Sequence, residues 1–270
     1  MKNAFSMMIA TGFAVSALSF SLTGESGADS SPATKNSQPV IVELFTSEGC
    51  SSCPPADALL LKLESSPLVE GASIIALEEH VDYWNHEGWT DVYSSADWTL
   101  RQQEYVARFK EKEPYTPQMI VDGQSQLLGS QEVQARRAIQ QAATQKKTEV
   151  ELAVENSSPD GAQQLEVHVG KLTGNTDRDT AEVWLAVSEG GLQSDVGAGE
   201  NAGKTLHHAS VLRSLRKVGV ATPTGESAFE ASTRVRFKPE WRRRNLQVVV
   251  FVQEKKTMHI LGAASVGVPN

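Results

Sequence analysis

Residues 42–57 have the sequence Val-Glu-Leu-Phe-Thr-Ser-Glu-Gly-Cys-Ser-Ser-Cys-Pro-Pro-Ala-Asp. The apolar start of this block predicts a short buried strand, and the run at 56–63 predicts a helix with the two prolines in its first turn. We expect that helix to begin near Ser51. Cys50 and Cys53, which are the only two cysteines of the chain, then lie where a strand leads into a helix.

This position predicts redox chemistry for the cysteine pair. The unbonded N–H groups and the dipole of a helix N-terminus stabilise a thiolate, so we expect the pKa of Cys50 to fall below the free value of about 8.5. Cys53 would then resolve a mixed disulfide formed at Cys50. Two alternatives stay open. The two thiolates could bind Cu(I) or Zn²⁺ together with His80 or His86, or the pair could be a structural disulfide that closes a short loop.

The first half of the chain alternates strand-like and helix-like segments. Pattern and turn chemistry predict strand, helix, strand, helix, a hairpin around Asp122-Gly123, and a last helix. The ranges are 40–45, 56–63, 72–77, 95–110, 118–121 with 125–128, and 130–145. This order predicts a mixed sheet with helices on both faces.

After Lys147 the chain changes to short β-rich runs separated by Gly, Pro, Asn and Asp. These runs are 149–155, 164–170, 182–188, 205–213, 229–237, 247–253 and 259–264. They predict an all-β sandwich. The segment 190–204 contains five glycines and is too long for a hairpin turn. We expect a loop that either folds toward Cys50, with polar contacts from Glu200 and Asn201 and with glycines that allow close backbone approach, or is a flexible loop in solvent.

The N-terminal segment predicts an exported protein. Residues 1–28 combine a basic start, an apolar stretch and small residues, as in a secretory signal, and residues 29–38 resemble a linker. We therefore expect a periplasmic or secreted protein with domains at 39–147 and 148–270, in contact with a membrane only if the signal is not cleaved. The net charge of −8 argues against a nucleic-acid partner, which requires a basic face.

The block at 42–57 resembles the signature of a family of bacterial secreted proteins that carry a thioredoxin-like domain and have been catalogued as a domain of unknown function. The resemblance continues through 80–84, 88–89, 101–105, 115–123, 199–203 and 211–214. It covers nearly all of the chain after the signal segment. The family implies a thioredoxin-like fold more than an activity.

The wider thioredoxin superfamily implies roles for three further residues. Thr116 and Pro117 stand where that superfamily has a cis-proline loop beside the disulfide. Glu43 is similar in strand position to the buried acid that assists proton transfer to the second cysteine, although its spacing to Cys50 is one residue longer. The aromatic and histidine-rich segment 80–98 either lines a substrate groove or forms a packed corner.

The resulting functional prediction is thiol–disulfide exchange with other exported proteins. The residues expected to carry it are Cys50, Cys53, Thr116, Pro117 and Glu43, with no bound cofactor or metal. Its partners would be exported protein thiols or disulfides and a redox partner. The alternatives are a copper or zinc metallochaperone and a non-catalytic binding module. Oxidants, reductants and isomerases share this motif and differ in redox potential, so the sequence sets no direction of exchange.

Overall fold

The computed structural model describes Met1 and residues 37–66, 68–157, 162–173, 179–223 and 225–269. Three α-helices lie within these ranges: α1 (Pro54–Ser65), α2 (Ala96–Phe109) and α3 (Glu132–Ala143). The same ranges contain thirteen strands: β1 (Gln38–Thr46), β2 (Ala72–His80), β3 (Gln118–Val121), β4 (Ser125–Leu128), β5 (Val150–Ser157), β6 (Gln163–Gly170), β7 (Ala181–Glu189), β8 (Leu192–Asp195), β9 (Thr205–His208), β10 (Val211–Ala221), β11 (Ser227–Val235), β12 (Leu246–Glu254) and β13 (Ile260–Gly267).

Local chemistry explains where two of the helices begin. Helix α1 begins with Pro54 and Pro55, whose missing N–H groups lie among the donors that a first helical turn leaves unbonded. Helix α2 is capped by Ser95, whose side-chain oxygen accepts the Asp97 N–H at 3.2 Å. It ends where Lys110 adopts a left-handed conformation with φ of 60°.

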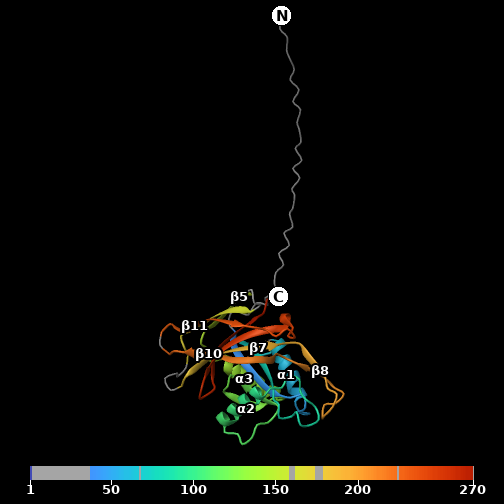
Figure 1. Ribbon diagram of the computed structural model, residues 1–270. Helices are drawn as coiled ribbons and strands as arrows, with labels where there is room; N and C mark the ends of the chain where they lie inside the picture. Colours follow the sequence, from blue (N-terminus) through green and yellow to red (C-terminus); the bar gives the residue numbers. More distant parts are fainter. Residues whose placement is uncertain (2–36, 67, 158–161, 174–178, 224, 270) are drawn as a thin grey trace. The chain divides into compact units, whose positions relative to one another are not determined.

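The main sheet has eight strands in the order β13-β12-β7-β10-β2-β1-β3-β4. Strands β1 and β2 are parallel, and β3 and β4 extend the sheet as an antiparallel hairpin. On the other side of β2 the neighbour is β10, which comes from the second half of the chain. The two strands are parallel and pair Val211 with Glu78, so one sheet contains strands of both halves (Figure 1).

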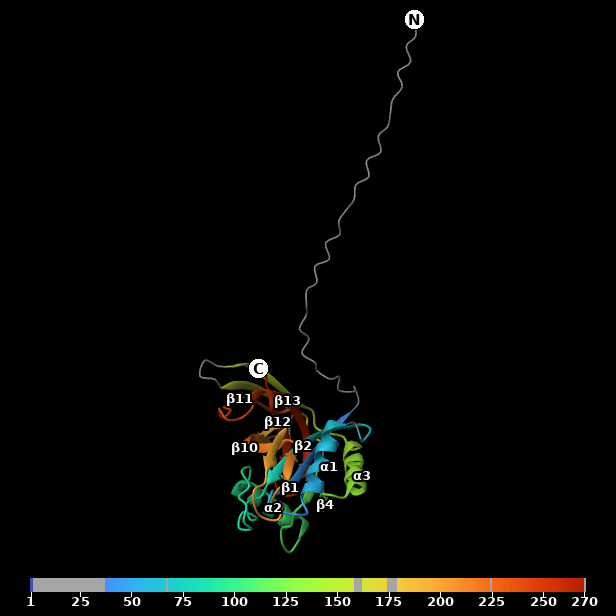
Figure 2. The same cartoon turned by 90° about the vertical axis from the view of Figure 1, so that its right-hand side faces the viewer.

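The even-numbered side chains of β1 face α1 and α3. Val42 and Leu44 belong to a fully buried cluster with Leu60 of α1 and Ile139 of α3. Figure 2 shows α1 and α3 beside β1, at the edge of the molecule away from β12. This face buries apolar area against helices, because successive side chains of a strand point to opposite faces of the sheet.

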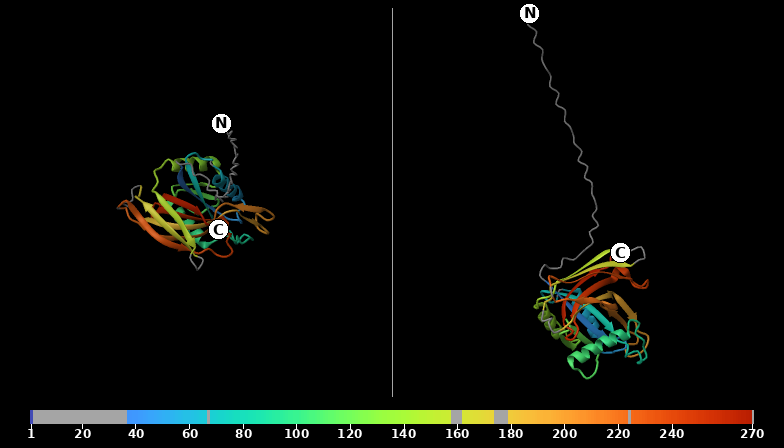
Figure 3. Two further views of the ribbon diagram at one scale, coloured as in Figure 1. Left: turned by 90° about the horizontal axis from the view of Figure 1, so that it is seen from above. Right: turned by 60° about the vertical axis from the view of Figure 1, so that its left-hand side comes forward.

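The odd-numbered side chains of β1 and β2 lie on the opposite face, where strands of the second half and helix α2 cover them. Ile41 and Leu77 share a cluster with Val249 and Phe251 of β12, and Trp98 of α2 joins it. A third layer, the sheet β11-β6-β5, covers the outer face of β7 and β12. Its apolar residues pack there in a separate cluster, and Figure 3 shows these strands outside the red strands of the C-terminus.

The predicted fold class is wrong. We expected an α/β thioredoxin-like domain with helices on both faces followed by an all-β sandwich, but the structure is mostly β and is built on the eight-stranded mixed sheet. The physical reason is which elements bury the face of β1 and β2 that lies opposite α1 and α3. The apolar face that carries Ile41 and Leu77 is buried mainly by strands of the second half. The described residues from Ser37 onward belong to one compact unit.

Most element positions agree with the sequence analysis. The hairpin strands match residue for residue, although the loop between them has three residues, 122–124, and not two. The run 205–213 divides into β9 and β10, and the segment predicted as a loop contains β8. Helix α3 begins at Glu132, two residues after the predicted start, and its N-cap residue is Gln131. Apart from Met1, the predicted signal at 1–28 and linker residues 29–36 lie outside the described residues.

Gly123 provides a test of how closely the two halves pack. It has a positive φ of 66°, and an added Cβ would collide with the backbone of Met258. We expect Gly123→Ala to lower the free energy of unfolding by well over the 1–2 kcal/mol that left-handed backbone costs an alanine. Gly71→Ala is the matched control, because Gly71 has a φ of 75° with nothing within 4 Å of an added Cβ. Equal losses in urea denaturation would contradict this packing.

Candidate functional site

The two cysteines form a disulfide directly in front of α1. Cys53 is the N-cap residue of the helix, and Cys50 lies in the preceding turn, which the Cys53 N–H closes by donating to the Cys50 carbonyl at 3.2 Å. Their Cα atoms are 5.4 Å apart, a separation typical of disulfides. The helix therefore begins at Pro54, three residues later than predicted. Both cysteines are fully buried.

A loop from the second half covers this turn. We name residues 196–204 the cover loop. The amide of Asn201 donates to the Glu48 carbonyl at 2.8 Å and to the Cys50 carbonyl at 3.0 Å. The carboxylate of Glu200 accepts the Ser51 N–H at 3.1 Å. The prediction that this segment folds toward Cys50 with these two polar contacts is confirmed.

Two glycines allow the cover loop to lie against Trp89. A Cβ on Gly199 would lie 3.0 Å from the Glu87 carbonyl oxygen, and one on Gly197 would lie 3.3 Å from the Trp89 ring. Gly199 also has a φ of 73°, which favours glycine. Trp89 donates its indole N–H to the carboxylate of Glu48 at 2.7 Å. The loop, the indole and the turn before Cys50 therefore form one packed unit.

The Thr116–Pro117 bond is cis, as predicted. The Thr116 hydroxyl accepts the indole N–H of Trp84 at 2.8 Å. A Cβ added to Gly129 would lie 3.0 Å from the Cβ of Ala56 and 3.1 Å from the Cβ of Pro117. The proline therefore lies close to the first turn of α1.

Glu43 is buried, but on the opposite face of β1 from α1. Arg101 of α2 binds its carboxylate through an N–H at 2.6 Å, and Tyr105 donates its hydroxyl to the same group. Burial, followed by the negative charge of Glu43, raises the pKa of the neighbouring Glu79 well above its usual value. The structure thus places Glu43 in an ion pair with Arg101 and not beside the cysteines, where the thioredoxin resemblance would have it.

Asp57 is the buried acid on the cysteine side of the sheet. It lies one helical turn after Cys53, to whose carbonyl its N–H donates at 3.2 Å, and its side chain accepts the Thr46 hydroxyl at 2.6 Å. Burial and then the negative charge of Glu78 raise the pKa of Asp57 to about 7, against the effect of the Thr46 hydrogen bond. The sequence analysis missed this role, although Asp57 lies four residues after Cys53 on a predicted helix, a spacing that places both on one face.

Five buried groups alternate between carboxylate and imidazole behind the cysteine turn. We name them the histidine–carboxylate cluster. Their order in space is Asp91, His80, Glu78, His208 and Glu48. Successive separations between nitrogen and oxygen are 2.6, 3.2, 2.9 and 3.3 Å. All five side chains are at most 2% exposed.

The opposite charges in this cluster stabilise each other. Burial opposes protonation of His208, but hydrogen bonds to Glu48 and Glu78 outweigh it and raise the pKa of this imidazole to about 9. Burial likewise opposes ionisation of Glu78, whereas hydrogen bonds from His208 and His80 lower its pKa to about 2. The cluster therefore holds paired charges in a buried interior, where isolated charges are strongly unfavourable.

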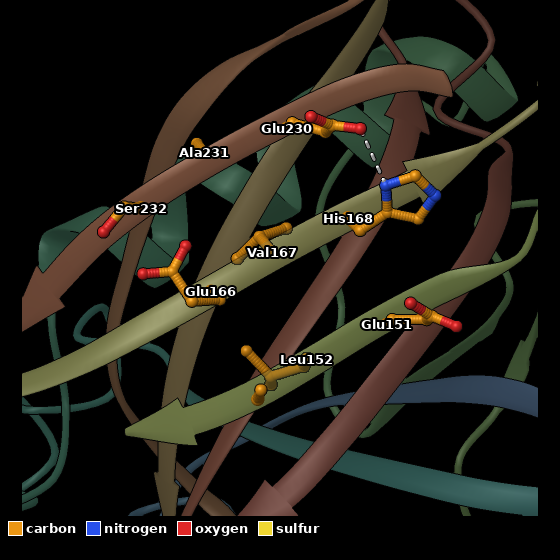
Figure 4. A pocket seen from close by; sticks show the side chains of 9 residues that line it. Glu151, Leu152, Glu166, Val167, His168, Glu230, Ala231 and Ser232 are labelled. Carbon is orange, nitrogen blue, oxygen red and sulfur yellow. Dashed lines mark ion pairs between the residues drawn. The ribbon is translucent and has the colours of Figure 1, made fainter. Parts of the chain in front are cut away.

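The described residues also form a surface pocket away from the disulfide, on the sheet β11-β6-β5 (Figure 4). Its polar lining includes three carboxylates, Glu151, Glu166 and Glu230. His168 lies 3.3 Å from Glu230, and both side chains are open to solvent. The pocket thus has an exposed acidic lining, unlike the buried, charge-paired groups behind the cysteines.

Residues 41–253 match the family described as "Protein of unknown function (DUF1223)", and the chain belongs to this family. A protein of Agrobacterium tumefaciens with a crystal structure is similar over 85% of this chain and 94% of its own, with 24% identity and a TM-score of 0.60. HBP35 of Porphyromonas gingivalis is similar over 86% of this chain and 76% of its own, with 15% identity and a TM-score of 0.65. At these identities the likeness concerns the fold alone. No curated protein matches the chain.

The raised pKa of Asp57 makes a prediction about stability. The folded carboxyl keeps its proton to about pH 7, whereas an unfolded aspartate releases it near its usual pKa of 3.8. The unfolded state then binds fewer protons between these values. The free energy of unfolding of the wild type, relative to Asp57→Asn, should fall by up to about 1.4 kcal/mol per pH unit from pH 4 to 7 and then level off. Urea denaturation across this range measures the slope, and identical pH profiles of the two proteins would contradict a protonated Asp57.

Proposed function

We propose that this protein exchanges disulfides with other exported proteins through Cys50 and Cys53. The observation that carries the proposal is the position of the disulfide directly in front of α1, with Asp57 one turn further on. The exported partners and a periplasmic or secreted location follow from the signal-like segment 1–28. Among the described residues, no helix is long and apolar enough to span a bilayer.

In one direction of the proposed exchange, a partner thiolate attacks the Sγ of Cys50. The Cys50–Cys53 bond breaks, a mixed disulfide forms, and Cys53 leaves as a thiolate that takes a proton. Asp57, whose pKa is about 7, suits the donation of that proton, because a group that transfers protons works best near the ambient pH. A second partner thiolate then displaces Cys50, so the partner is oxidised by two electrons and the cysteine pair is reduced. The reverse sequence reduces a partner disulfide.

Exchange in this protein requires the cover loop to move, because both cysteines are fully buried. Three hydrogen bonds from Glu200 and Asn201 hold the loop on residues 48–51. Each hydrogen bond contributes about 1 kcal/mol net, so thermal fluctuations can open the cover loop. The proposal therefore assigns the loop control over access to Cys50.

The test of function follows covalent intermediates with a reduced exported protein as the partner. We expect the wild type to oxidise the partner, and Cys50→Ala to abolish exchange. Cys53→Ala, treated first with a disulfide reagent that activates Cys50, should accumulate a mixed disulfide with the partner because the resolving thiol is missing. Non-reducing electrophoresis and mass spectrometry identify the linked cysteine. Absence of exchange in the wild type, together with absence of a Cys50-linked species, would make the pair a structural disulfide.

The role of the cover loop is tested by the rate at which dithiothreitol reduces the disulfide. Asn201→Ala removes two hydrogen bonds to backbone carbonyls and should raise this rate about tenfold, since about 1.4 kcal/mol corresponds to a factor of ten. Asn245→Ala is the matched control. Its amide also donates to a backbone carbonyl, that of Gly190 at 3.0 Å, but Gly190 lies at the other end of the glycine-rich segment 190–204. A rate that is unchanged in Asn201→Ala would contradict the role of the loop.

A further inference from the structure

We propose that Glu78, His80 and His208 form a binding site for one divalent transition-metal ion such as Zn²⁺. Glu78 and His80 are two residues apart on β2, so their side chains leave the same face of the strand. His208 ends β9 and approaches from the second half of the chain. All three side chains are at most 1% exposed.

The three candidate ligand atoms converge on one region. Nε2 of His80 and Nδ1 of His208 lie 3.2 and 2.9 Å from the same oxygen, Oε1 of Glu78. The three atoms lie within 4.8 Å of one another. Ligands of a tetrahedral zinc ion are about 3.3 Å apart, given zinc–nitrogen and zinc–oxygen bonds of about 2.0–2.1 Å. For the two distances to Oε1 of Glu78, an ion therefore needs outward movements of only a few tenths of an ångström, and the two imidazole nitrogens lie no further than 4.8 Å apart.

The neighbours of these ligands match the outer shell of a metal site. Nδ1 of His80 bonds Asp91 at 2.6 Å, and Nε2 of His208 bonds Glu48 at 3.3 Å. Metal-bound histidines characteristically give their second nitrogen to a carboxylate, which fixes the ring and its tautomer. The other oxygen of Glu78 accepts the N–H of Ala209, which leaves Oε1 as the oxygen turned toward the two imidazoles.

Charge and ligand type favour a divalent ion of intermediate softness. Three carboxylates, Glu48, Glu78 and Asp91, face two imidazoles. When both imidazoles are neutral, as metal ligation requires, a divalent cation offsets two of the three negative charges. Nitrogen and oxygen ligands without thiolate suit Zn²⁺ or Co²⁺ more than Cu(I). No cysteine joins a three-ligand cluster anywhere in the described part of the chain. The site thus differs in its ligands from the metallochaperone alternative, which joined the thiolates of Cys50 and Cys53 to His80 or His86.

The experiment uses the full chain, unfolded in urea with chelator and refolded with Zn²⁺ or Co²⁺, so that the buried position does not prevent loading. After dialysis, elemental analysis should find about one ion per chain, and a melt with bound ion should shift upward. Glu78→Gln and His208→Gln should each lose the ion. Asp91→Asn should keep the stoichiometry but bind about 10–100-fold more weakly, as expected for an outer-shell partner.

Two controls separate this site from other ligands of the chain. His168→Gln removes an exposed histidine that also faces a glutamate, and it should retain the ion, as should the double variant Cys50→Ser/Cys53→Ser. If circular dichroism shows that a cluster variant does not fold, the visible absorption spectrum of the wild type with Co²⁺ bound identifies the type of ligand. Nitrogen and oxygen ligation gives d–d bands without a thiolate charge-transfer band. No retained ion, retention by folded Glu78→Gln, or a thiolate band would each overturn the proposal.

Discussion

The carboxylate of Glu78 and the strand that carries it join the two halves of this protein. The backbone of Glu78 pairs with Val211 in the parallel bridge between β2 and β10, and its N–H donates to the Ser210 carbonyl at 2.9 Å. Its side chain bonds His80, His208 and the N–H of Ala209. Hydrogen bonds between charged groups are about twice as strong as neutral ones. The sheet, the histidine–carboxylate cluster and the placement of β9 therefore depend on one buried acid.

Glu48 connects this cluster to the disulfide. Its carboxylate reaches His208 and Trp89, while its carbonyl accepts the amide of Asn201. Two residues further along the chain, Cys50 is bound by the same amide. A displacement of the cover loop therefore changes the surroundings of the cysteines and of Glu48 together, although the two centres share no ligand atom.

The sequence predicted local structure well and long-range structure poorly, for a physical reason. β-branched runs and turn residues locate strands because these signals act over a few neighbours. The sequence shows that an apolar face such as that of Ile41 and Leu77 must be buried, but not whether a helix or a strand buries it. Here the residues that cover it come mainly from β12. The cluster was missed because Glu78 and His208 are 130 residues apart. The contact of Asn201 was predictable because a long glycine-rich segment needs a nearby surface.

The cysteine turn and its cover are separated by about 150 residues of chain, and this distance orders events during synthesis. A chain that emerges from its N-terminus exposes Cys50 and Cys53 well before residues 196–208 exist to cover them. Contacts between distant residues also form late in folding, because closing a long loop costs entropy first. Other molecules therefore reach Cys50 and Cys53 most easily before residues 196–208 have folded over them, and the completed cover loop and β9 enclose the pair. The order of folding therefore determines when the two cysteines are accessible, although the finished structure does not display that order.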